Sequence, residues 1–338
     1  MKTMIVRAPA GLDRLRMEDR PDPGAPGPGE IRVALHGSSL NYHDLGVVTG
    51  RMGAPDPEQG RVPLADGAGV VDAVGEGVTE FAPGDQVVSC FFPQWQDGTA
   101  QVGDFAGTPG DGIDGFAQEV AVRAATAFTH APKHLDAVES ATITTAGLTA
   151  WRALVGDGGL KAGDTVLLLG TGGVSIWALQ IAKAMGATVA ITSSSGEKLE
   201  RARDLGADFT LNYRETPEWG RAIADWTGGL GVDHVVEVGG PGTLAQSIGA
   251  VRVGGHISLI GVLTGASGEV PTAALMAKQA RLQGLIVGSR RMQQDFVRAI
   301  EANDIRPVID RRFPLDRLAD AFAYEQSAGH FGKIGVEW

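Results

Sequence analysis

Three glycines, Gly170, Gly172 and Gly173, separate a short apolar run from a segment with helical spacing, and this arrangement can bind a phosphate. The apolar run, Val166–Leu169, predicts a buried parallel strand, and the residues after the turn predict a helix. Such a turn lets backbone N–H groups and the positive helix N-terminus face a pyrophosphate, which a Cβ would keep away. The pattern G-x-G-x-x-S ends in Ser175 instead of glycine or alanine, so a plain α/β turn without a ligand is the alternative.

The residues after the next predicted strand could recognise the ribose of a dinucleotide. That strand, Thr188–Thr192, ends ~20 residues past the glycine turn, where a ribose-binding residue is expected. NAD is usually recognised there by a carboxylate, whereas Ser193 and Ser194 are small hydrogen-bond donors. Lys198 can supply positive charge to a 2′-phosphate, so the sequence favours NADPH. In the alternative, Lys198 is a solvated helix residue and Glu197 binds the ribose.

Length, composition and charge restrict the function classes. A chain of 338 residues should hold about two domains. Its formal charge of −11 argues against nucleic acid or an anionic membrane as the main partner. No apolar run approaches about 18 residues and the N-terminus lacks a signal-like segment, so we expect a cytoplasmic protein. Cys90 is the only cysteine, which excludes a disulfide within the chain and a zinc site built of cysteines.

The order of the predicted elements indicates two kinds of architecture. Residues 1–125 contain short strands separated by glycine and proline turns, which suggests a small barrel. After the glycine turn, helices and strands alternate as in a doubly wound parallel sheet, with Leu282–Val287 at its edge. A helix over Asp295–Asn303 then returns the chain to the first domain, which residues 304–338 should complete.

A segment of ~20 residues, Pro93–Asp114, lacks any regular pattern, which is unusual inside a compact domain. Its apolar residues Trp95, Phe105 and Ile113 could cover a pocket. The segment is therefore interpreted either as a lid or as a solvated insertion.

At this point the chain resembles the medium-chain dehydrogenase/reductase superfamily, and within it the zinc-free branch of quinone oxidoreductases and enoyl reductases. The resemblance implies an α/β protein with a GroES-like β-barrel domain at 1–127 and 300–338. A Rossmann domain at 128–299 interrupts it, and the active site lies in the cleft. The motifs that carry the resemblance are L-N-Y-H-D at 40–44, P-L-A-D-G-A-G-V-V at 63–71, V-G-E-G-V at 74–78, A-G-L-T-A-W at 146–151, L-L-G-T-G-G-V-S at 168–175, V-V-E-V-G-G at 235–240 and H-F-G-K at 330–333.

The chain departs from the zinc-binding members of this family at the metal ligands. A cysteine of those members falls on Asn41, their G-H-E motif falls on Leu64-Ala65-Asp66, and a second cysteine falls on Thr145. Ala65 cannot bind a metal, and Asn41 and Thr145 are poor zinc ligands. We therefore expect no metal site.

Without a metal, hydrogen-bond donors must stabilise a developing oxyanion, and a conjugated enone or quinone is an easier substrate than an isolated ketone. The candidate catalytic residues are Asn41, as a donor to substrate or carboxamide oxygen, Tyr42 or His43, as proton donors, and Asp66. For Asp44 we favour a different role, because N-x-x-D at 41–44 can cap a helix over 43–48. The catalytic tyrosine of family enoyl reductases falls on Met52, which argues against a dedicated acyl-thioester reductase.

The resemblance also implies the cofactor contacts. A lysine and a tyrosine of NADPH-using quinone oxidoreductases match Lys198 and Tyr213. The other expected cofactor-binding residues come from the shared motifs and from the segment that follows the fifth strand of the sheet; they are Thr149, Val174, Gly239, Gly261 and Lys333.

The sequence thus predicts an NADPH-dependent, zinc-independent oxidoreductase that transfers hydride to an enone, enal or quinone. An NAD(P)-dependent alcohol dehydrogenase or aldehyde reductase is one alternative, and a cofactor-binding protein with a structural or regulatory role is another. A small molecule is the expected partner. Since bare sheet edges invite pairing, and family members often join such edges, a homodimer is also expected.

Overall fold

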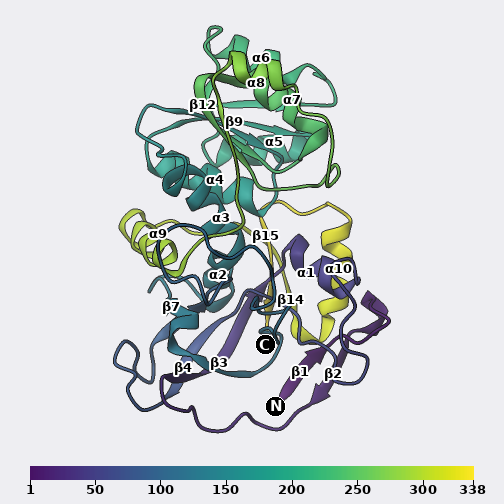
Figure 1. The fold of residues 1–338 in the computed structure, drawn as a ribbon, viewed down its shortest axis with the longest axis vertical. Helices are drawn as coiled ribbons and strands as arrows, with labels where there is room; N and C mark the ends of the chain where they lie inside the picture. Colours follow the sequence, from purple (N-terminus) through teal and green to yellow (C-terminus); the bar gives the residue numbers. More distant parts are fainter. The chain divides into compact units, whose positions relative to one another are not determined.

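The computed structural model describes all of residues 1–338, and the chain divides into two compact units (Figure 1). The first unit contains Met1–Leu148 and Val287–Trp338, and the second contains Thr149–Ile286. The first unit is therefore discontinuous in sequence, and the C-terminal segment completes it. No helix in the chain is both long and apolar enough to cross a membrane.

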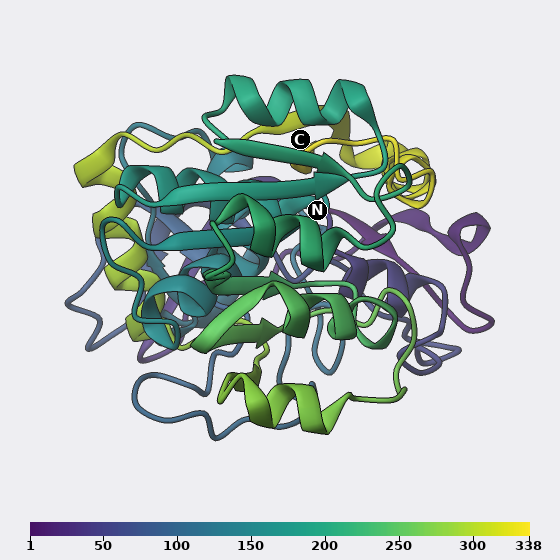
Figure 2. The same ribbon diagram turned by 90° about the horizontal axis from the view of Figure 1, so that it is seen from above.

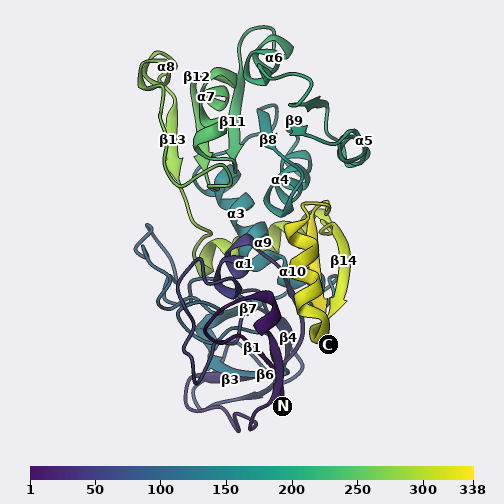
Figure 3. The ribbon, with the colours of Figure 1, turned by 90° about the vertical axis from the view of Figure 1, so that its right-hand side faces the viewer.

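The second unit is built on a six-stranded parallel sheet with strand order β10-β9-β8-β11-β12-β13. Figure 3 shows the labelled strands in this order from β13 to β9, and Figure 2 shows strands of this unit side by side. The chain adds strands first on one side of β8 and then on the other, which is the doubly wound order that the sequence predicted. The strands are β8 (Thr165–Leu169), β9 (Thr188–Ser193), β10 (Phe209–Asn212), β11 (Val232–Glu237), β12 (Val251–Leu259) and β13 (Arg281–Gly284).

Helices connect these strands and supply much of the apolar core. The connecting helices are α4 (Gly173–Ala184), α5 (Gly196–Asp204), α6 (Trp219–Trp226), α7 (Pro241–Ala250) and α8 (Thr272–Ala277), and the short segments α3 (Leu148–Trp151) and η4 (Arg152–Gly156) precede β8. Helices α6 and α7 place Ile223 and Ile248 in one buried cluster with Leu167 and Val235 of the sheet. Burial of these side chains from water is the main favourable term that holds the helices on the strands.

The last strand of this sheet, β13, pairs only with β12 and forms an edge, as the sequence predicted. It ends at Gly284, earlier than the predicted strand Leu282–Val287, although Leu285 N still donates to Leu259 O at 3.0 Å; Leu285 and Val287 are buried. Ile286 between them is 43% exposed.

The first unit contains a seven-stranded sheet in which β3 is the central strand. The path is β14-β15-β3-β4-β5-β7, and β6 also pairs with β3. The ladder between β3 and β4 shifts register twice, and bulges of this kind bend a strand so that it can pair on several sides. The strands are β3 (Glu30–Ser39), β4 (Ala68–Val74), β5 (Gln86–Ser89), β6 (Val120–Ala124), β7 (Phe128–His130), β14 (Ile309–Pro314) and β15 (Lys333–Glu337); β1 (Lys2–Ile5) and β2 (Arg16–Asp19) form a separate pair.

Helices of the first unit come from both of its chain segments. They are α1 (Tyr42–Val48), α2 (Ala137–Ala141), α9 (Arg290–Asn303) and α10 (Leu318–Gln326), with the π-helical segment η3 (Ile143–Gly147) directly after α2. Strand β15 pairs with β3 and β14 pairs with β15, so residues 309–337 contribute two strands to the sheet of the first unit.

The unit borders differ from the predicted domain boundaries at 127/128 and 299/300, which both lie inside the first unit. Strand β7 pairs with β5, and α2 packs on the same sheet. Helix α9 is fixed there by Gln293, whose Nε2 donates to Ser89 O at 3.0 Å and to Thr129 Oγ1 at 2.8 Å. Packing between segments distant in sequence, which periodicity does not reveal, sets these borders.

The irregular segment 93–114 contains no helix or strand, as expected. Trp95 is buried, and its ring lies 6.4 Å from that of Phe92. Phe105 stacks on Phe92 at 6.3 Å and also contacts the ring of His43 at 4.6 Å. The segment is therefore packed onto the first unit by its aromatic residues.

Candidate functional site

Helix α1 begins at the predicted N-x-x-D cap. Asn41 has extended backbone angles, and its backbone N–H donates to Asp44 Oδ2 at 3.0 Å. This hydrogen bond satisfies a donor that the helix itself leaves unpaired. The capping role predicted for Asp44 is present, and the helix starts one residue earlier than expected.

The first turn of α1 directs three consecutive polar side chains to different surroundings, since successive helical residues are about 100° apart. Tyr42 is 46% exposed, His43 is half-buried and Asp44 is fully buried. The candidate proton donors Tyr42 and His43 therefore do not share one environment.

His43 lies in an aromatic pocket and meets a carboxylate that the sequence did not suggest. Its Nε2 is 3.1 Å from Asp111 Oδ2, and its ring contacts Phe91 and Phe105 at 5.5 and 4.6 Å. Burial lowers the pKa of His43, and the nearby Asp111 raises it; burial also raises the pKa of Asp111. The two groups form a pair that can hold and release one proton.

Asp66 is the centre of a buried polar network. Its Oδ2 accepts hydrogen bonds from Asn41 Nδ2 at 2.9 Å and from the Ser39 hydroxyl, and its Oδ1 accepts one from Thr145 Oγ1 at 2.6 Å. Leu64, two residues before Asp66, has a φ of 76°, in the left-handed region that non-glycine residues rarely adopt. The backbone is thus held in a costly conformation beside the residue that collects these contacts.

Lys333 supplies the positive charge of this network. It is 4% exposed, and its Nζ donates to Asn41 Oδ1 at 2.6 Å and to Leu40 O. The same Nζ lies 3.7 Å from Asp66 Oδ2. The sequence predicted that Lys333 contacts the cofactor. In the structure its ammonium group contacts Asn41, Leu40 and Asp66, all in the first unit.

Asp44 is the second buried carboxylate. It accepts from Ala65 N at 2.9 Å and from Asn41 Nδ2 at 3.1 Å. Burial, followed by the charge of Asp66, raises its pKa to about 7, while these N–H donors and Lys333 lower it. Two carboxylates and one ammonium group therefore share a site closed to water.

Glu325 on α10 is a further buried acid that the sequence analysis missed. It is 3% exposed, and its Oε2 has no hydrogen-bond partner. Burial raises its pKa to about 8; Lys333 and Arg51 act in the opposite direction and Asp44 acts in the same one. A signal was present, because Leu318, Ala321 and Phe322 mark the apolar face of α10 and Glu325 continues it at helical spacing.

These residues do not fit the zinc ion of the family's metal-binding members. Ala65 has no side-chain ligand; its backbone N–H donates to Asp44 and its carbonyl oxygen accepts from the Ser89 hydroxyl. The Asn41 amide and the Thr145 hydroxyl are bonded within the network, and the Lys333 ammonium group already contacts the side chains of Asn41 and Asp66. Zinc prefers thiolate, imidazole and carboxylate ligands. Of these, the matching positions offer only the Asp66 carboxylate, which already accepts hydrogen bonds and lies close to the Lys333 ammonium group.

In the second unit, the glycine turn follows β8 at the point where the strand order reverses. Gly170 has a φ of 72°, and a Cβ at Gly170 or Gly172 would meet no protein atom within 4 Å. The space in front of the turn is therefore open to a ligand. Gly172 caps the twelve-residue helix α4, whose half-buried first residues are Gly173 and Val174. A pyrophosphate fits this position.

Ser175 explains the unusual end of the glycine pattern. Its hydroxyl donates to Leu169 O at 2.6 Å and is buried. The hydroxyl is thus satisfied at the end of β8, so a serine is tolerated where helix and strand pack closely.

Glu237 shapes the second turn at the reversal point. Its Oε1 accepts from Gly239 N at 2.8 Å, Gly240 N at 3.0 Å and Thr243 Oγ1 at 2.6 Å. A Cβ at Gly261 would lie 2.0 Å from Val238 O, so close packing of the backbone requires a glycine there. Cofactor contact by Gly239 and Gly261 stays a prediction.

The end of β9 carries no carboxylate. Ser193 Oγ accepts from Ser195 N at 3.3 Å, and Ser195 Oγ accepts from Lys198 N at 3.3 Å as the cap of α5. Tyr213 N donates to Ser193 O at 3.2 Å, so the 40% exposed Tyr213 lies beside the strand end. Ser194 is half-buried. The residues predicted to recognise the 2′-phosphate thus lie close together in the chain's fold; they are Ser193, Ser194, Lys198 and Tyr213. Thr149, by contrast, is buried in α3 at the start of the second unit.

Comparison with known proteins identifies the two units. Residues 27–133 match the alcohol dehydrogenase GroES-like domain, and residues 173–302 match the zinc-binding dehydrogenase domain. A zinc-type alcohol dehydrogenase-like protein of Schizosaccharomyces pombe is 44% identical over 334 residues, covering 96% of this chain and 95% of its own length. The chain belongs to the medium-chain dehydrogenase/reductase superfamily. The resemblance and the α/β fold class, a GroES-like barrel with a Rossmann domain, are thereby confirmed.

Other medium-chain dehydrogenase/reductase proteins are similar over nearly the whole chain. A 2-haloacrylate reductase of Burkholderia sp. is 32% identical, covering 92% of this chain and 91% of its own. A solved protein from Sinorhizobium meliloti 1021, assigned as an alcohol dehydrogenase, is 41% identical with a TM-score of 0.93, covering 100% and 98% of the two chains. An NAD-dependent alcohol dehydrogenase (34%, TM-score 0.88, 100% of both chains) and mycobacterial Rv1454c complexed with NADPH (26%, TM-score 0.82, 100% of both chains) also match. The protein is an oxidoreductase with a nicotinamide cofactor.

Replacing Glu325 with glutamine should change how stability depends on pH. The folded-state pKa of about 8 exceeds the value of about 4.3 expected in the unfolded chain, so the folded protein keeps a proton that the unfolded chain releases. The stability gained this way is complete below about pH 4 and is lost as the pH rises to about 8. Compared with the parent, Glu325→Gln should gain roughly 2–4 kcal/mol more at pH 8.5 than at pH 5.

Thermal and denaturant unfolding at the two pH values measures this difference. The exposed Glu76→Gln in the same unit is the matched control and should show no pH-dependent gain. A gain for Glu325→Gln that is the same at both pH values would show that the carboxyl group is not held protonated.

Proposed function

We propose that the protein is an NADPH-dependent reductase that acts, without a metal, on a conjugated carbonyl compound or a quinone. The observation that carries the proposal is the buried Lys333–Asp66–Asn41 network, which takes the place of a zinc site. The 2-haloacrylate reductase supports it, since that relative is named for reduction of a conjugated acid.

The substrate class follows from what the residues can stabilise. An isolated ketone needs strong polarisation of its oxygen, which a Lewis acid supplies and neutral donors supply poorly. In an enone or quinone, negative charge spreads over a conjugated system, so hydrogen-bond donors suffice. When bound, the nicotinamide would supply hydride, and the chain must then supply one proton.

His43 and Asp111 are proposed to deliver that proton. The pair is half-buried, and its 3.1 Å contact lets Asp111 orient the imidazole and stabilise its protonated form. Tyr42, whose pKa is raised mainly by burial, is the second candidate donor.

Asn41 and Asp66 take positioning roles in this proposal. The side-chain NH2 group of Asn41 donates to Asp44 and Asp66, and its carbonyl oxygen accepts from Lys333. Asn41 therefore has little hydrogen-bonding capacity left for a substrate. Asp66 holds Thr145 and Lys333 in place and fixes the start of α1 through Asn41.

An alcohol dehydrogenase or aldehyde reductase is the second candidate. The names of the S. pombe and S. meliloti relatives favour it. The third candidate is a non-catalytic role, in which the chain would bind the cofactor without oxidising it.

The two catalytic candidates predict different substrate preferences. With NADPH, 2-cyclohexen-1-one, trans-2-hexenal or 1,4-benzoquinone should give a kcat/KM about 100-fold or more above that of the matched saturated cyclohexanone and hexanal. Cofactor oxidation followed by absorbance measures it. Equal or faster reduction of the saturated compounds would favour an alcohol dehydrogenase, and no turnover would favour a non-catalytic protein.

His43→Gln should lower kcat about 100-fold while leaving the KM for NADPH unchanged.

The preference for NADPH is proposed from the strand end of the second unit. Ser193 and Ser194 present hydroxyl and backbone groups, Tyr213 lies beside them, and Lys198 is in the first turn of the following helix. The 2′-phosphate of NADPH would be bound by charge-assisted hydrogen bonds, which contribute roughly 1.5–3 kcal/mol each.

Lys198→Ala should therefore raise the KM for NADPH about tenfold or more and leave that for NADH nearly unchanged. Ser194→Asp should reverse the preference, because a fixed negative charge repels the phosphate and suits a free ribose diol. Steady-state kinetics with both cofactors measures this, with the exposed Lys161→Ala as control. A parent protein that prefers NADH, or equal weakening of both cofactors by Lys198→Ala, would contradict the assignment.

We also propose a homodimer joined at the β13 edge, a cytoplasmic location and a small molecule as the only other partner. The bare edge of the parallel sheet and the exposed Ile286 beside it support the dimer.

A further inference from the structure

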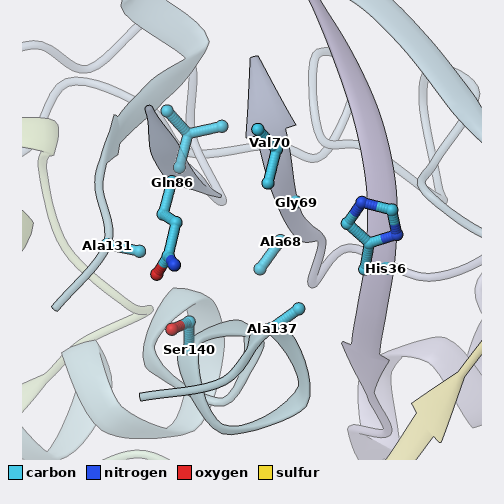
Figure 4. A pocket seen from close by; sticks show the side chains of 9 residues that line it. His36, Ala68, Gly69, Val70, Gln86, Ala131, Ala137 and Ser140 are labelled. Carbon is cyan, nitrogen blue, oxygen red and sulfur yellow. The ribbon is translucent and has the colours of Figure 1, made fainter. Parts of the chain in front are cut away.

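The first unit contains a cavity of about 250 Å³ on the side of the sheet that α2 covers (Figure 4). It is lined by strands β3, β4 and β5 and by α2, with apolar walls from Ala68, Val70 and Val87. Its volume is below the roughly 300–1,000 Å³ of sites for drug-sized ligands, so only a small molecule fits.

Three polar side chains border the cavity, and one of them is buried without a partner. Ser140 on α2 is 1% exposed, and its Oγ makes no hydrogen bond. A buried hydroxyl without a protein partner costs stability, and a ligand hydroxyl in the cavity could supply the missing hydrogen bond. Figure 4 shows the Gln86 amide pointing towards α2 and the His36 ring on the opposite side of the cavity.

His36 reaches the cavity because of a backbone irregularity. The register between β3 and β4 shifts between Leu35 and Gly37, so His36 is the extra residue of a bulge. Bulges re-aim a side chain and are frequent beside functional sites. Gly37 is needed at the same place, since a Cβ there would lie 2.5 Å from Val138 N of α2.

We propose that this cavity is a binding site for a small uncharged molecule that carries neighbouring hydroxyl groups, such as a diol. No aspartate, glutamate, lysine or arginine lines it, so nothing there would compensate a charged ligand. Ser140, Gln86 and His36 can each donate and accept, which matches hydroxyl groups, and the apolar walls match a short carbon chain.

The site is separate from the buried network around Asp66, although both use the same elements. Ala68 follows Asp66 by two residues at the start of β4, and Ser140 precedes Thr145 on the continuous α2–η3 segment. None of the residues that line the cavity takes part in the proposed reaction.

Titration of the full chain with propane-1,2-diol, followed by amide chemical shifts in NMR, tests the proposal. Saturable shifts with a millimolar Kd should appear at residues 68–70, 86–87 and 137–140. Ser140→Ala should weaken binding about fivefold, the loss of one neutral hydrogen bond, and should raise the Tm of the free protein by about 1–3 °C. Ala137→Leu should abolish binding by filling the cavity.

Gln86→Leu, at an exposed position, serves as a second variant that leaves the core untouched, and it should also weaken binding. Ser267→Ala, an exposed serine of the second unit, should change nothing. The absence of saturable shifts, unchanged binding in Ala137→Leu, or equal binding of sodium acetate would overturn the proposal.

Discussion

The structure of the first unit depends on the buried ammonium group of Lys333. An ammonium ion and a carboxylate removed from water are costly, and they persist only where each is bonded. Lys333 comes from the last strand and contacts Asn41 and Leu40 before α1 and Asp66 before β4, while Thr145 joins from η3. One cation therefore holds together segments that are far apart in the chain. Its removal would leave the carboxyl groups of Asp44 and Asp66 buried with hydrogen-bond donors but without a neighbouring positive charge.

This constraint also limits the chemistry. A network whose donors and acceptors are all used is rigid and well suited to hold its neighbours, but it offers no open position to polarise a carbonyl oxygen. In the proposed reaction, the proton-donating groups lie at its border, where His43 and Asp111 meet in an aromatic pocket. Substrates that spread negative charge over a conjugated system suit such a site better than isolated ketones.

Much of the fold could be predicted from local pattern. The glycine turn at 170–173, the alternation that follows it and the cap at Asn41 are signals within a few residues, and the structure contains each of them. Ala65 likewise argues against a metal site from residue chemistry alone, and this stays a prediction.

Features that depend on distant contacts could not be predicted. Asp111, which meets His43, lies within the irregular segment, whose path no periodicity describes. The lysine at 333 was recognised as part of a motif, but only the pairing of β15 with β3 carries it to Asn41. The bulge at His36 depends on the register between β3 and β4, whereas the helical spacing of Leu318, Ala321 and Phe322 did mark the buried position of Glu325.

Metal content tests the central claim most directly. The purified chain, analysed for elements while its reduction of 2-cyclohexen-1-one by NADPH is followed in a strong chelator, should hold well under about 0.1 zinc per chain and keep its full activity. One zinc per chain, with activity lost on chelation and restored by zinc, would contradict the account.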